Sequence, residues 1–293
     1  MSYQVARTLA EVASALAGSP PDLLVLAGGT DVQVRTRDAV RRRPVLDVAR
    51  VTELRRIDRD GADLVLGAAI TYAQCLADPR IRQAAPLLTR VAERFASPQI
   101  RAVATLGGNV ANASPAGDGV AALWALDTRV DALTPDGLVT WPIARVVVGP
   151  GRLGLPAGSV LTAFRLPVRV AGEGQGFYKL VNRAWPEHPM AIAVASAAVR
   201  LALDGAGRVR FARVVLGAVA PTPVRAGAAE AAILGGVPGP EVVDAAARAA
   251  AATAQPISDV RAGAAYRQDV LPAVVRMAIE TALRDAGESR DAP

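Results

Sequence analysis

The sequence predicts a protein of mixed helices and sheets, and three observations support this prediction. Short apolar runs typical of buried strands alternate with segments of helical periodicity. Hydrophobic residues make up 52% of the chain, mostly Ala, Val and Leu, whereas aromatic residues make up only 4%. A length of 293 residues is enough for a large core and ordinarily for two domains. Together these observations favour an α/β composition.

The first half of the chain alternates between predicted helices and strands. Residues 8–18 have the spacing of an amphipathic helix, which ends at Gly18 before a Ser-Pro-Pro break. The Asp60-Gly61 dipeptide predicts a hairpin between the runs 54–57 and 64–67. Further strands are expected at 23–26, 45–48, 129–133, 138–141 and 160–166, and helices at 71–96, with breaks at Pro79 and Pro86, and at 120–126.

The second half begins after a region rich in Gly and Pro, residues 149–176, where two domains are expected to separate. An Ala/Val/Ile run at 191–203, helical or extended, is followed by a turn and an alternating strand at 209–219. Alanine-rich helices are expected at 225–234 and 240–254, and a last helix at 270–285.

Two glycine pairs beside small polar residues are the strongest functional signal in the sequence. Gly28-Gly29 follows the strand 23–26, and Gly107-Gly108 comes about eighty residues later. Because glycine has no Cβ, backbone amides at such turns can approach an anion closely. Two of these turns that meet in space are expected to cradle a diphosphate. Neither turn has the Gly-Lys-Ser/Thr of a Walker A loop or the Gly-x-Gly-x-x-Gly spacing of a dinucleotide fold.

A third glycine-rich string, residues 149–154, does match the Gly-x-Gly-x-x-Gly spacing. That motif binds a dinucleotide only where a helix opens from it and presents its N-terminus to phosphate. Here Pro156 and the strand-like pair Val160-Leu161 follow instead. We therefore reject this string as a dinucleotide site.

The composition excludes several classes of site. A single cysteine, Cys75, excludes an internal disulfide, a Cys-rich zinc site and an iron–sulfur cluster held by this chain alone. A single histidine, His188, excludes a multi-histidine metal site, and we predict no metal. We find no Ser-His-Asp or Cys-His constellation and assign no catalytic residue. The net charge of +6 comes from scattered basic residues, including the loop or interface cluster Arg41–Arg43, so we expect no nucleic-acid partner.

No N-terminal signal pattern and no uninterrupted apolar run of membrane-spanning length is present, which favours a cytoplasmic protein without a membrane span. Lys179 is the only lysine among 33 basic residues. Its uniqueness raises the question of a functional role, with a surface position as the alternative.

Four ordered segments, which span almost the whole chain, resemble one known family. The first two are 26–32, with the sequence Leu-Ala-Gly-Gly-Thr-Asp-Val, and 104–115, which is followed by Asp118. The third is 176–180 with Arg183, and the fourth is 258–267 near the C-terminus. These segments are similar to the FAD-binding (medium) subunit of the molybdenum hydroxylases, the group of xanthine dehydrogenase, carbon monoxide dehydrogenase and aldehyde oxidoreductase.

The resemblance implies an α+β fold. An FAD-binding domain of the p-cresol methylhydroxylase type, made of two α/β subdomains, is expected over residues 1–172. A smaller α+β domain, of the carbon monoxide dehydrogenase flavoprotein C-terminal type, is expected over residues 173–293.

The resemblance also implies an FAD site, with residues 27–31 and 107–109 around the diphosphate and their backbone amides doing most of the binding. Asp118 would accept hydrogen bonds from a cofactor hydroxyl, although an Asp before a helix is also a common N-cap. Lys179 would lie near the flavin ring. The cofactor-binding residues predicted in this way are Leu26, Ala27, Gly28, Gly29, Thr30, Asp31, Val32, Thr105, Gly107, Gly108, Asn109, Asn112, Ser114, Asp118, Leu161 and Lys179.

The function implied is that of an oxidoreductase subunit that transfers electrons through non-covalent FAD. Electrons would come from an iron–sulfur small subunit, beside a large subunit with the molybdenum cofactor, in a dimer of heterotrimers. They would leave to an external acceptor such as NAD, dioxygen or a quinone. Two alternatives remain: a stand-alone FAD-dependent oxidase or reductase of the same fold, and a binding or scaffold subunit that has lost its cofactor. The organic substrate is not readable from this chain.

Overall fold

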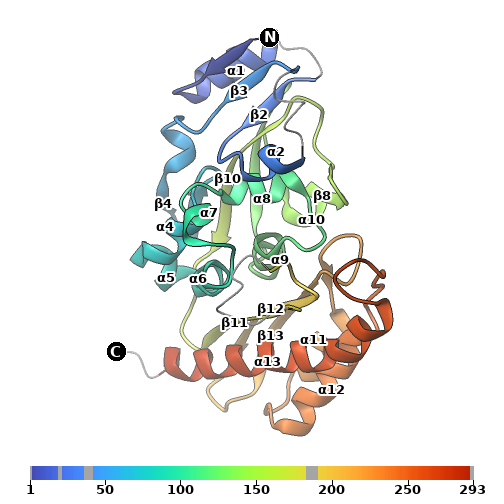
Figure 1. Ribbon diagram of the computed structural model, residues 1–293. Helices are drawn as coiled ribbons and strands as arrows, with labels where there is room; N and C mark the ends of the chain where they lie inside the picture. The colour runs from blue at the N-terminus through green and yellow to red at the C-terminus, as the bar shows by residue number, and fades with distance from the viewer. Residues whose placement is uncertain (1, 19–21, 36–41, 183–190, 291–293) are drawn as a thin grey trace.

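The computed structural model describes residues 2–18, 22–35, 42–182 and 191–290. Two bodies lie one above the other in Figure 1, with the helices and sheets of the N-terminal half above the C-terminal sheet. Within the described residues, no helix is both long enough and apolar enough to cross a membrane.

A small parallel sheet begins the chain, with the strand order β1-β3-β2. Thr8 caps the first helix by accepting a hydrogen bond from the amide of Glu11, and the buried side chains of Val12 and Leu16 pack this helix on the sheet. The elements are β1 (Tyr3–Val5), α1 (Leu9–Ala17), β2 (Leu24–Leu26), α2 (Thr30–Arg35) and β3 (Val45–Asp47).

A five-stranded antiparallel sheet follows, with the order β4-β5-β10-β6-β7. Strand residues alternate between its two faces, so Leu66, Val130 and Phe164 are buried under the helices while Asp131 and Arg165 lie on the other face. The strands are β4 (Ile57–Asp60), β5 (Asp63–Gly67), β6 (Arg129–Thr134), β7 (Gly137–Pro142) and β10 (Val160–Pro167), preceded by the 3₁₀ turn η1 (Glu53–Arg55).

The helices of this domain are short because prolines and caps interrupt them. Proline occupies the first position of three successive helices, where its missing N–H costs nothing. They are α4 (Tyr72–Ala77), α5 (Pro79–Ala84), α6 (Pro86–Glu93), α7 (Pro98–Arg101), α8 (Leu106–Asn112), α9 (Asp118–Ala125) and α10 (Ile143–Val146), and the hairpin β8 (Val147–Gly149) and β9 (Arg152–Leu153) follows.

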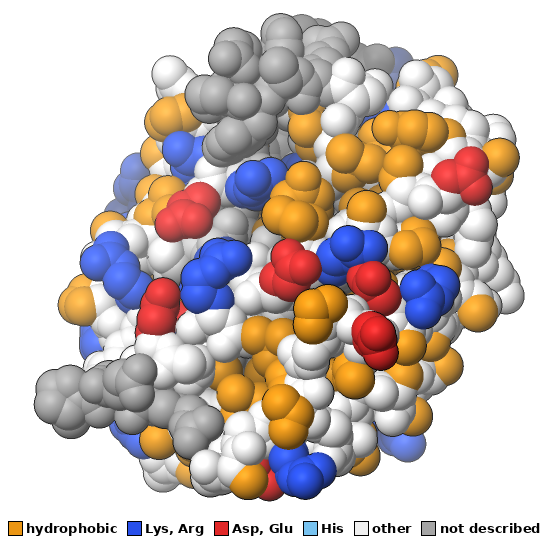
Figure 2. Space-filling model, turned by 90° about the horizontal axis from the view of Figure 1, so that it is seen from below, with side chains coloured by type: hydrophobic (Ala, Val, Ile, Leu, Met, Phe, Trp, Pro, Cys, Tyr) orange, Lys and Arg blue, Asp and Glu red, His pale blue; other side chains and the backbone are white. Residues whose placement is uncertain are grey.

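The C-terminal body is an antiparallel sheet of four strands, β11-β12-β13-β14, with helices on one face. Its outer surface carries acidic and basic side chains side by side, without a broad patch of one sign on the face shown in Figure 2. The elements are β11 (Glu173–Leu180), β12 (Ala195–Leu203), β13 (Val209–Gly217), β14 (Val224–Arg225), α11 (Gly227–Ile233), α12 (Pro240–Ala251) and α13 (Ala264–Arg290).

Glycines on β11 allow α13 to lie directly on the strand. A Cβ at Gly176 would be 2.6 Å from the amide nitrogen of Ala282 and closer still to the carbonyl oxygen of Ala278. We expect Gly176→Ala to lower the free energy of unfolding by about 2 kcal/mol, because backbone must move to accept the methyl group. Denaturant unfolding measures this change, and Gly205→Ala, where a Cβ meets nothing within 4 Å, is the matched control. Equal stability of the two variants contradicts this packing.

Hydrogen bonds of the segment 258–267 fix the position of the start of α13. The Arg267 guanidinium donates to the carbonyl oxygens of Val194 (2.9 Å) and Ala218 (2.7 Å) and to Asp259 Oδ1 (2.7 Å). The backbone amide of Arg261 also donates to this carboxylate. This hydrogen bond, together with the charge of Arg267, lowers the pKa of Asp259 from 3.8 to about 2.

This lowered pKa predicts a pH dependence of stability. The unfolded carboxyl binds its proton near pH 4 and the folded one near pH 2, so the stabilisation is complete above pH 4 and is lost as the pH falls through 2. As the pH falls from 4 to 2, we expect the free energy of unfolding of Asp259→Asn to fall by about 1 kcal/mol less than that of the unsubstituted protein. This value allows for the solvent exposure of the carboxylate. Urea unfolding at a series of pH values measures the difference, and parallel pH profiles would contradict it.

The sequence predictions for most elements agree with the structure, with three differences. The run 54–57, expected as a strand, is mostly the 3₁₀ turn η1, and β4 begins at Ile57. The last helix is longer than expected, and residues 191–203, expected to be helical or extended, form a strand from residue 195. Gly107 and Gly108 lie inside α8 and not in a turn, because Thr105 caps a helix at this point. The rejected string 149–154 opens no helix and forms the β8–β9 hairpin.

The two bodies contact each other mainly through α6 and α9. Asp118, the first residue of α9, forms an ion pair with Lys179 of β11 (2.7 Å). Asp127, just after the end of α9, forms an ion pair with Arg213 of β13 (3.0 Å). Both ends of α9 are thus bound to the C-terminal sheet. The division into domains at residues 172 and 173 stays a prediction.

Candidate functional site

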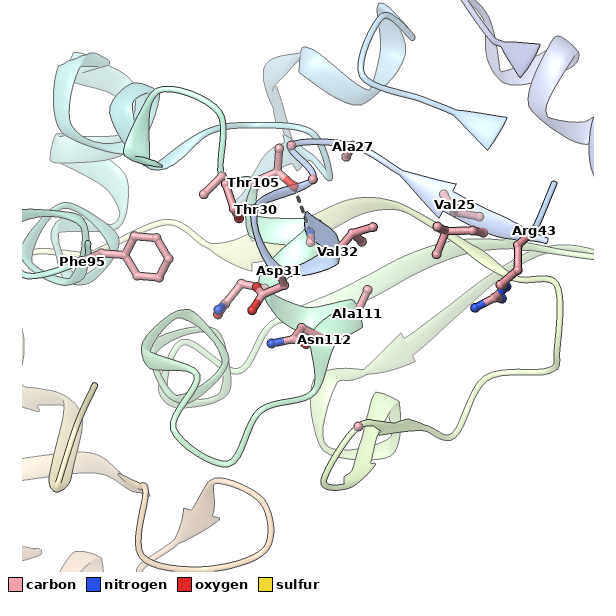
Figure 3. A pocket seen from close by; sticks show the side chains of 17 residues that line it. Val25, Ala27, Thr30, Asp31, Val32, Arg43, Phe95, Thr105, Ala111 and Asn112 are labelled. Atoms are coloured by element: carbon pink, nitrogen blue, oxygen red, sulfur yellow. Dashed lines mark hydrogen bonds between the residues drawn. The ribbon is translucent and has the colours of Figure 1, made fainter. Parts of the chain in front are cut away.

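A pocket of about 440 Å³ opens where the end of β2 meets α8. Figure 3 shows Phe95 at one end of it, Val25 and Arg43 at the other, and Asp31 and Asn112 between them. The lining residues are Leu24, Val25, Ala27, Gly28, Gly29, Thr30, Asp31, Val32, Arg43, Phe95, Ala104, Thr105, Gly108, Asn109, Ala111, Asn112 and Gly151. Both glycine segments therefore contribute to one pocket.

The first wall is the turn between β2 and α2. A Cβ at Gly28 would collide with the carbonyl oxygen of Val103, so the two segments touch through backbone. Gly29 has a φ of +70°, which favours glycine. In the described part of the chain, the amides of Gly28, Gly29, Thr30 and Asp31 donate no hydrogen bond. This turn thus offers a row of free N–H donors to an anion.

The second wall is α8, whose amides are already engaged. Gly107 donates to the carbonyl oxygen of Ala68 (2.8 Å), Gly108 to Thr105 Oγ1 (2.9 Å) and Asn109 to the carbonyl oxygen of Thr105 (3.0 Å). These three amides donate within the protein because the segment folds as a capped helix, and their part in diphosphate binding stays a prediction. Side chains and the open backbone surface at Gly108 remain available on this wall.

Five predicted residues lie outside this lining, as does Gly107. Leu26 belongs to β2, Leu161 is buried in β10, and Ser114 follows α8. Asp118 and Lys179 are buried and bonded to each other. Asp118 Oδ1 has no hydrogen-bond partner within the described residues, and Asp118 does not act as the N-cap, a position that Gly117 holds. The roles of these residues toward FAD stay predictions.

Sequence reasoning missed seven lining residues. Arg43 was predicted for a solvated loop or an interface, but its guanidinium donates to the carbonyl oxygen of Asp22 (2.6 Å) and lines the pocket. Gly151 lies in the rejected glycine string and reaches the pocket through the β8–β9 turn. Ala104 and Ala111 lie in the family-like segment 104–115 but were not singled out there. The others, Leu24, Val25 and Phe95, carry no local signal of a binding role.

Among the described residues, no group of three or more His, Cys, Asp or Glu side chains is placed to hold a metal ion. Cys75 is buried and outside the pocket lining, and burial raises the pKa of its thiol to about 12. His188 and Arg183 lie outside the described residues, as does the segment 185–190.

Comparison with known proteins identifies the kind of protein that carries this pocket. Residues 1–169 match the model of the FAD-binding domain in molybdopterin dehydrogenases, and residues 178–282 match that of the CO dehydrogenase flavoprotein C-terminal domain. The chain belongs to this family of FAD-binding subunits. The family recognised from the four sequence segments, the mixed helix and sheet fold and the FAD-binding function are confirmed.

Individual relatives of this flavoprotein subunit cover almost its whole length. It is 31% identical to the putative xanthine dehydrogenase FAD-binding subunit of Escherichia coli K12, over 98% of this chain and 97% of the relative. The solved carbon monoxide dehydrogenase of Hydrogenophaga pseudoflava superposes with a TM-score of 0.89 at 30% identity, covering 97% of this chain and 98% of that chain. Quinoline 2-oxidoreductase from Pseudomonas putida 86 superposes with a TM-score of 0.87 at 25% identity, covering 99% and 98%.

Proposed function

We propose that this flavoprotein subunit holds FAD non-covalently in the pocket between the β2–α2 turn and α8 and passes electrons through it. Electrons would arrive from an iron–sulfur small subunit, in a cytoplasmic complex with a molybdenum-containing large subunit, and leave to an external acceptor. Relatives named as medium chains of carbon monoxide dehydrogenase and a medium subunit of nicotine 6-hydroxylase support partners of this kind. A dimer of such heterotrimers is part of the proposal.

The observation that carries the proposal is the row of free amides at residues 28–31, facing the side chains of α8 across one pocket. A diphosphate needs closely spaced N–H donors and room for its oxygens, and a glycine turn supplies both. Thr30 adds a hydroxyl donor, Asn109 an amide and Arg43 a positive charge at one end of the cavity. The residues present therefore fit a dinucleotide such as FAD.

The work of this chain is to bind, orient and shield the cofactor. FAD, when bound, supplies the two-electron chemistry, so the protein needs no acid–base constellation of its own. The Gly28–Val103 contact fixes the position of the donor row, and the ion pairs at the two ends of α9 hold the C-terminal sheet against the FAD-binding body. The buried Cys75, outside the lining, is consistent with non-covalent binding.

Reconstitution tests the proposal directly. Purified chain is mixed with FAD, freed of excess cofactor and examined for stoichiometric flavin absorbance that denaturation releases into solution. A protein without flavin absorbance would contradict the proposal. Flavin that stays attached after denaturation would contradict non-covalent binding. Oxidation of a small organic substrate by the isolated chain would favour the stand-alone oxidase.

Arg43 is expected to strengthen FAD binding through its charge. We expect Arg43→Gln to weaken FAD binding about fivefold at low salt and less at high salt, because an accessible arginine–phosphate attraction is screened. Fluorescence titration at two ionic strengths measures the effect, and Arg42→Gln is the matched control because Arg42 is exposed outside the pocket. Equal affinities of both variants would show that Arg43 serves only to hold the loop at Asp22.

A further inference from the structure

Behind the pocket wall, the buried Tyr72 stacks on Phe95. Their ring centroids are 3.7 Å apart and their planes differ by 7°. Tyr72 has no exposed surface, whereas Phe95 is partly exposed and lines the pocket. One face of the Phe95 ring is therefore covered by Tyr72, and the orientation of Phe95 toward a bound cofactor depends on that contact.

The backbone of Tyr72 is fixed to the same wall. Its amide donates to the carbonyl oxygen of Ala104 (3.1 Å), and Thr71 forms a β-bridge with Thr105, the cap of α8. The Phe95 side is fixed as well, because the Arg101 guanidinium donates to its carbonyl oxygen (2.9 Å). Tyr72 thus joins the segment that carries Phe95 to the segment that begins α8.

Two buried polar atoms in this region lack partners. The Tyr72 hydroxyl and Asn109 Oδ1 are both buried without a hydrogen bond within the described residues. Both lie against Gly119, where a Cβ would be 2.8 Å from Asn109 Oδ1 and would collide with the Tyr72 hydroxyl. A phenol donates and an amide oxygen accepts, so the two atoms are chemically complementary. Burial raises the pKa of Tyr72 well above its usual range, and the hydroxyl therefore keeps its proton.

Asn109 also lines the pocket. Since its amide oxygen is the buried end, its NH₂ end is the one that can reach a ligand. A hydrogen bond to the buried amide oxygen would keep the NH₂ group of Asn109 directed into the pocket. An amide that is free to turn would present its acceptor to a negatively charged diphosphate half of the time.

We propose that Tyr72 is a positioning residue of the FAD site, whose ring holds Phe95 in the pocket wall and whose hydroxyl holds the Asn109 amide through one bridging water. This inference rests on the proposed FAD-binding function. It adds a residue that does not itself line the pocket.

A double-mutant cycle in the full chain tests the hydroxyl. We expect Tyr72→Phe to weaken FAD binding about fivefold, the usual value of one hydrogen bond. In an Asn109→Ala background the same change should alter the dissociation constant less than twofold. Thermal unfolding without FAD should change little for Tyr72→Phe, because the hydroxyl makes no direct hydrogen bond within the described residues. A purely structural role would instead lower stability and affinity together.

Tyr72→Leu tests the ring, with Phe164→Leu as a control because Phe164 is equally buried in the same core, outside the pocket. We expect Tyr72→Leu to weaken FAD binding about tenfold more than the control does. An unchanged affinity for Tyr72→Phe, or an equal loss in both Asn109 backgrounds, overturns the hydroxyl assignment even if Tyr72→Leu does not fold. Failure of the unsubstituted chain to bind FAD would instead overturn the proposed function.

Discussion

Gly28→Val is expected to abolish useful FAD binding, with a loss in affinity of about a hundredfold or more. The Cβ of any side chain at this position would overlap the carbonyl oxygen of Val103, which is backbone and cannot rotate away. The β2–α2 turn would have to move from the α8 wall. Its free amides would then no longer face the pocket as a fixed row of donors. Equilibrium titration of the purified variant with FAD measures the loss.

The matched control for this substitution is Gly227→Ala, where an added Cβ meets nothing within 4 Å and lies far from the pocket lining. It should bind FAD as the unsubstituted protein does. Circular dichroism of both variants should show unchanged secondary structure, which separates a local displacement from global unfolding. A Gly28→Val protein that retains its flavin at normal affinity would show that this turn is not the diphosphate site.

Lys179→Met is expected to lower the free energy of unfolding by about 3 kcal/mol, because it leaves the Asp118 carboxylate buried without its cation. The two side chains are 6% and 4% exposed and their charged atoms are 2.7 Å apart. Asp118 Oδ1 already lacks a partner within the described residues, so nothing nearby compensates for the lost ammonium. Denaturant unfolding of the FAD-free protein measures the effect independently of any role in cofactor binding.

The double variant Lys179→Met with Asp118→Asn should recover most of that stability, because neutralising both partners removes the stranded charge. Arg276→Met breaks an ion pair of similar length, with Asp244, whose partners are 49% and 31% exposed. It should cost less than about 1 kcal/mol. A Lys179→Met protein as stable as Arg276→Met would mean that the pair between the two bodies is not desolvated.

Local sequence patterns predicted an element correctly where the residues of that element alone favour it. The Asp60-Gly61 hairpin, the helix breaks at Pro79 and Pro86 and the strand at 160–166 agree with the structure because turn chemistry and periodicity act over a few residues. The helix at 106–112 was missed for a related reason. Paired glycines lower helix propensity, and only the cap at Thr105 and the packing on Ala68 stabilise a helix there.

Some residues of the candidate site could likewise be predicted from the sequence, and others could not. The two glycine pairs could be found because their chemistry is visible in the residues themselves. Phe95, Arg43 and Gly151 could not, because each reaches the pocket from a segment with no binding motif. Lys179 drew attention as the only lysine, but its partner Asp118 lies 61 residues earlier, and sequence spacing alone does not reveal such a pair.

The sequence by itself determined the family, most of the helices and strands, and the two segments that face each other across the pocket. Those features follow from residue type and from spacing over short distances. Only the tertiary structure decided which amides remain free. Residues 28–31 form a turn after a strand, and their amides donate no hydrogen bond within the described residues. The amides of residues 107–109 donate hydrogen bonds to Ala68 and Thr105. Hydrogen-bond partners and buried contacts depend on segments brought together by packing, and no local pattern records them.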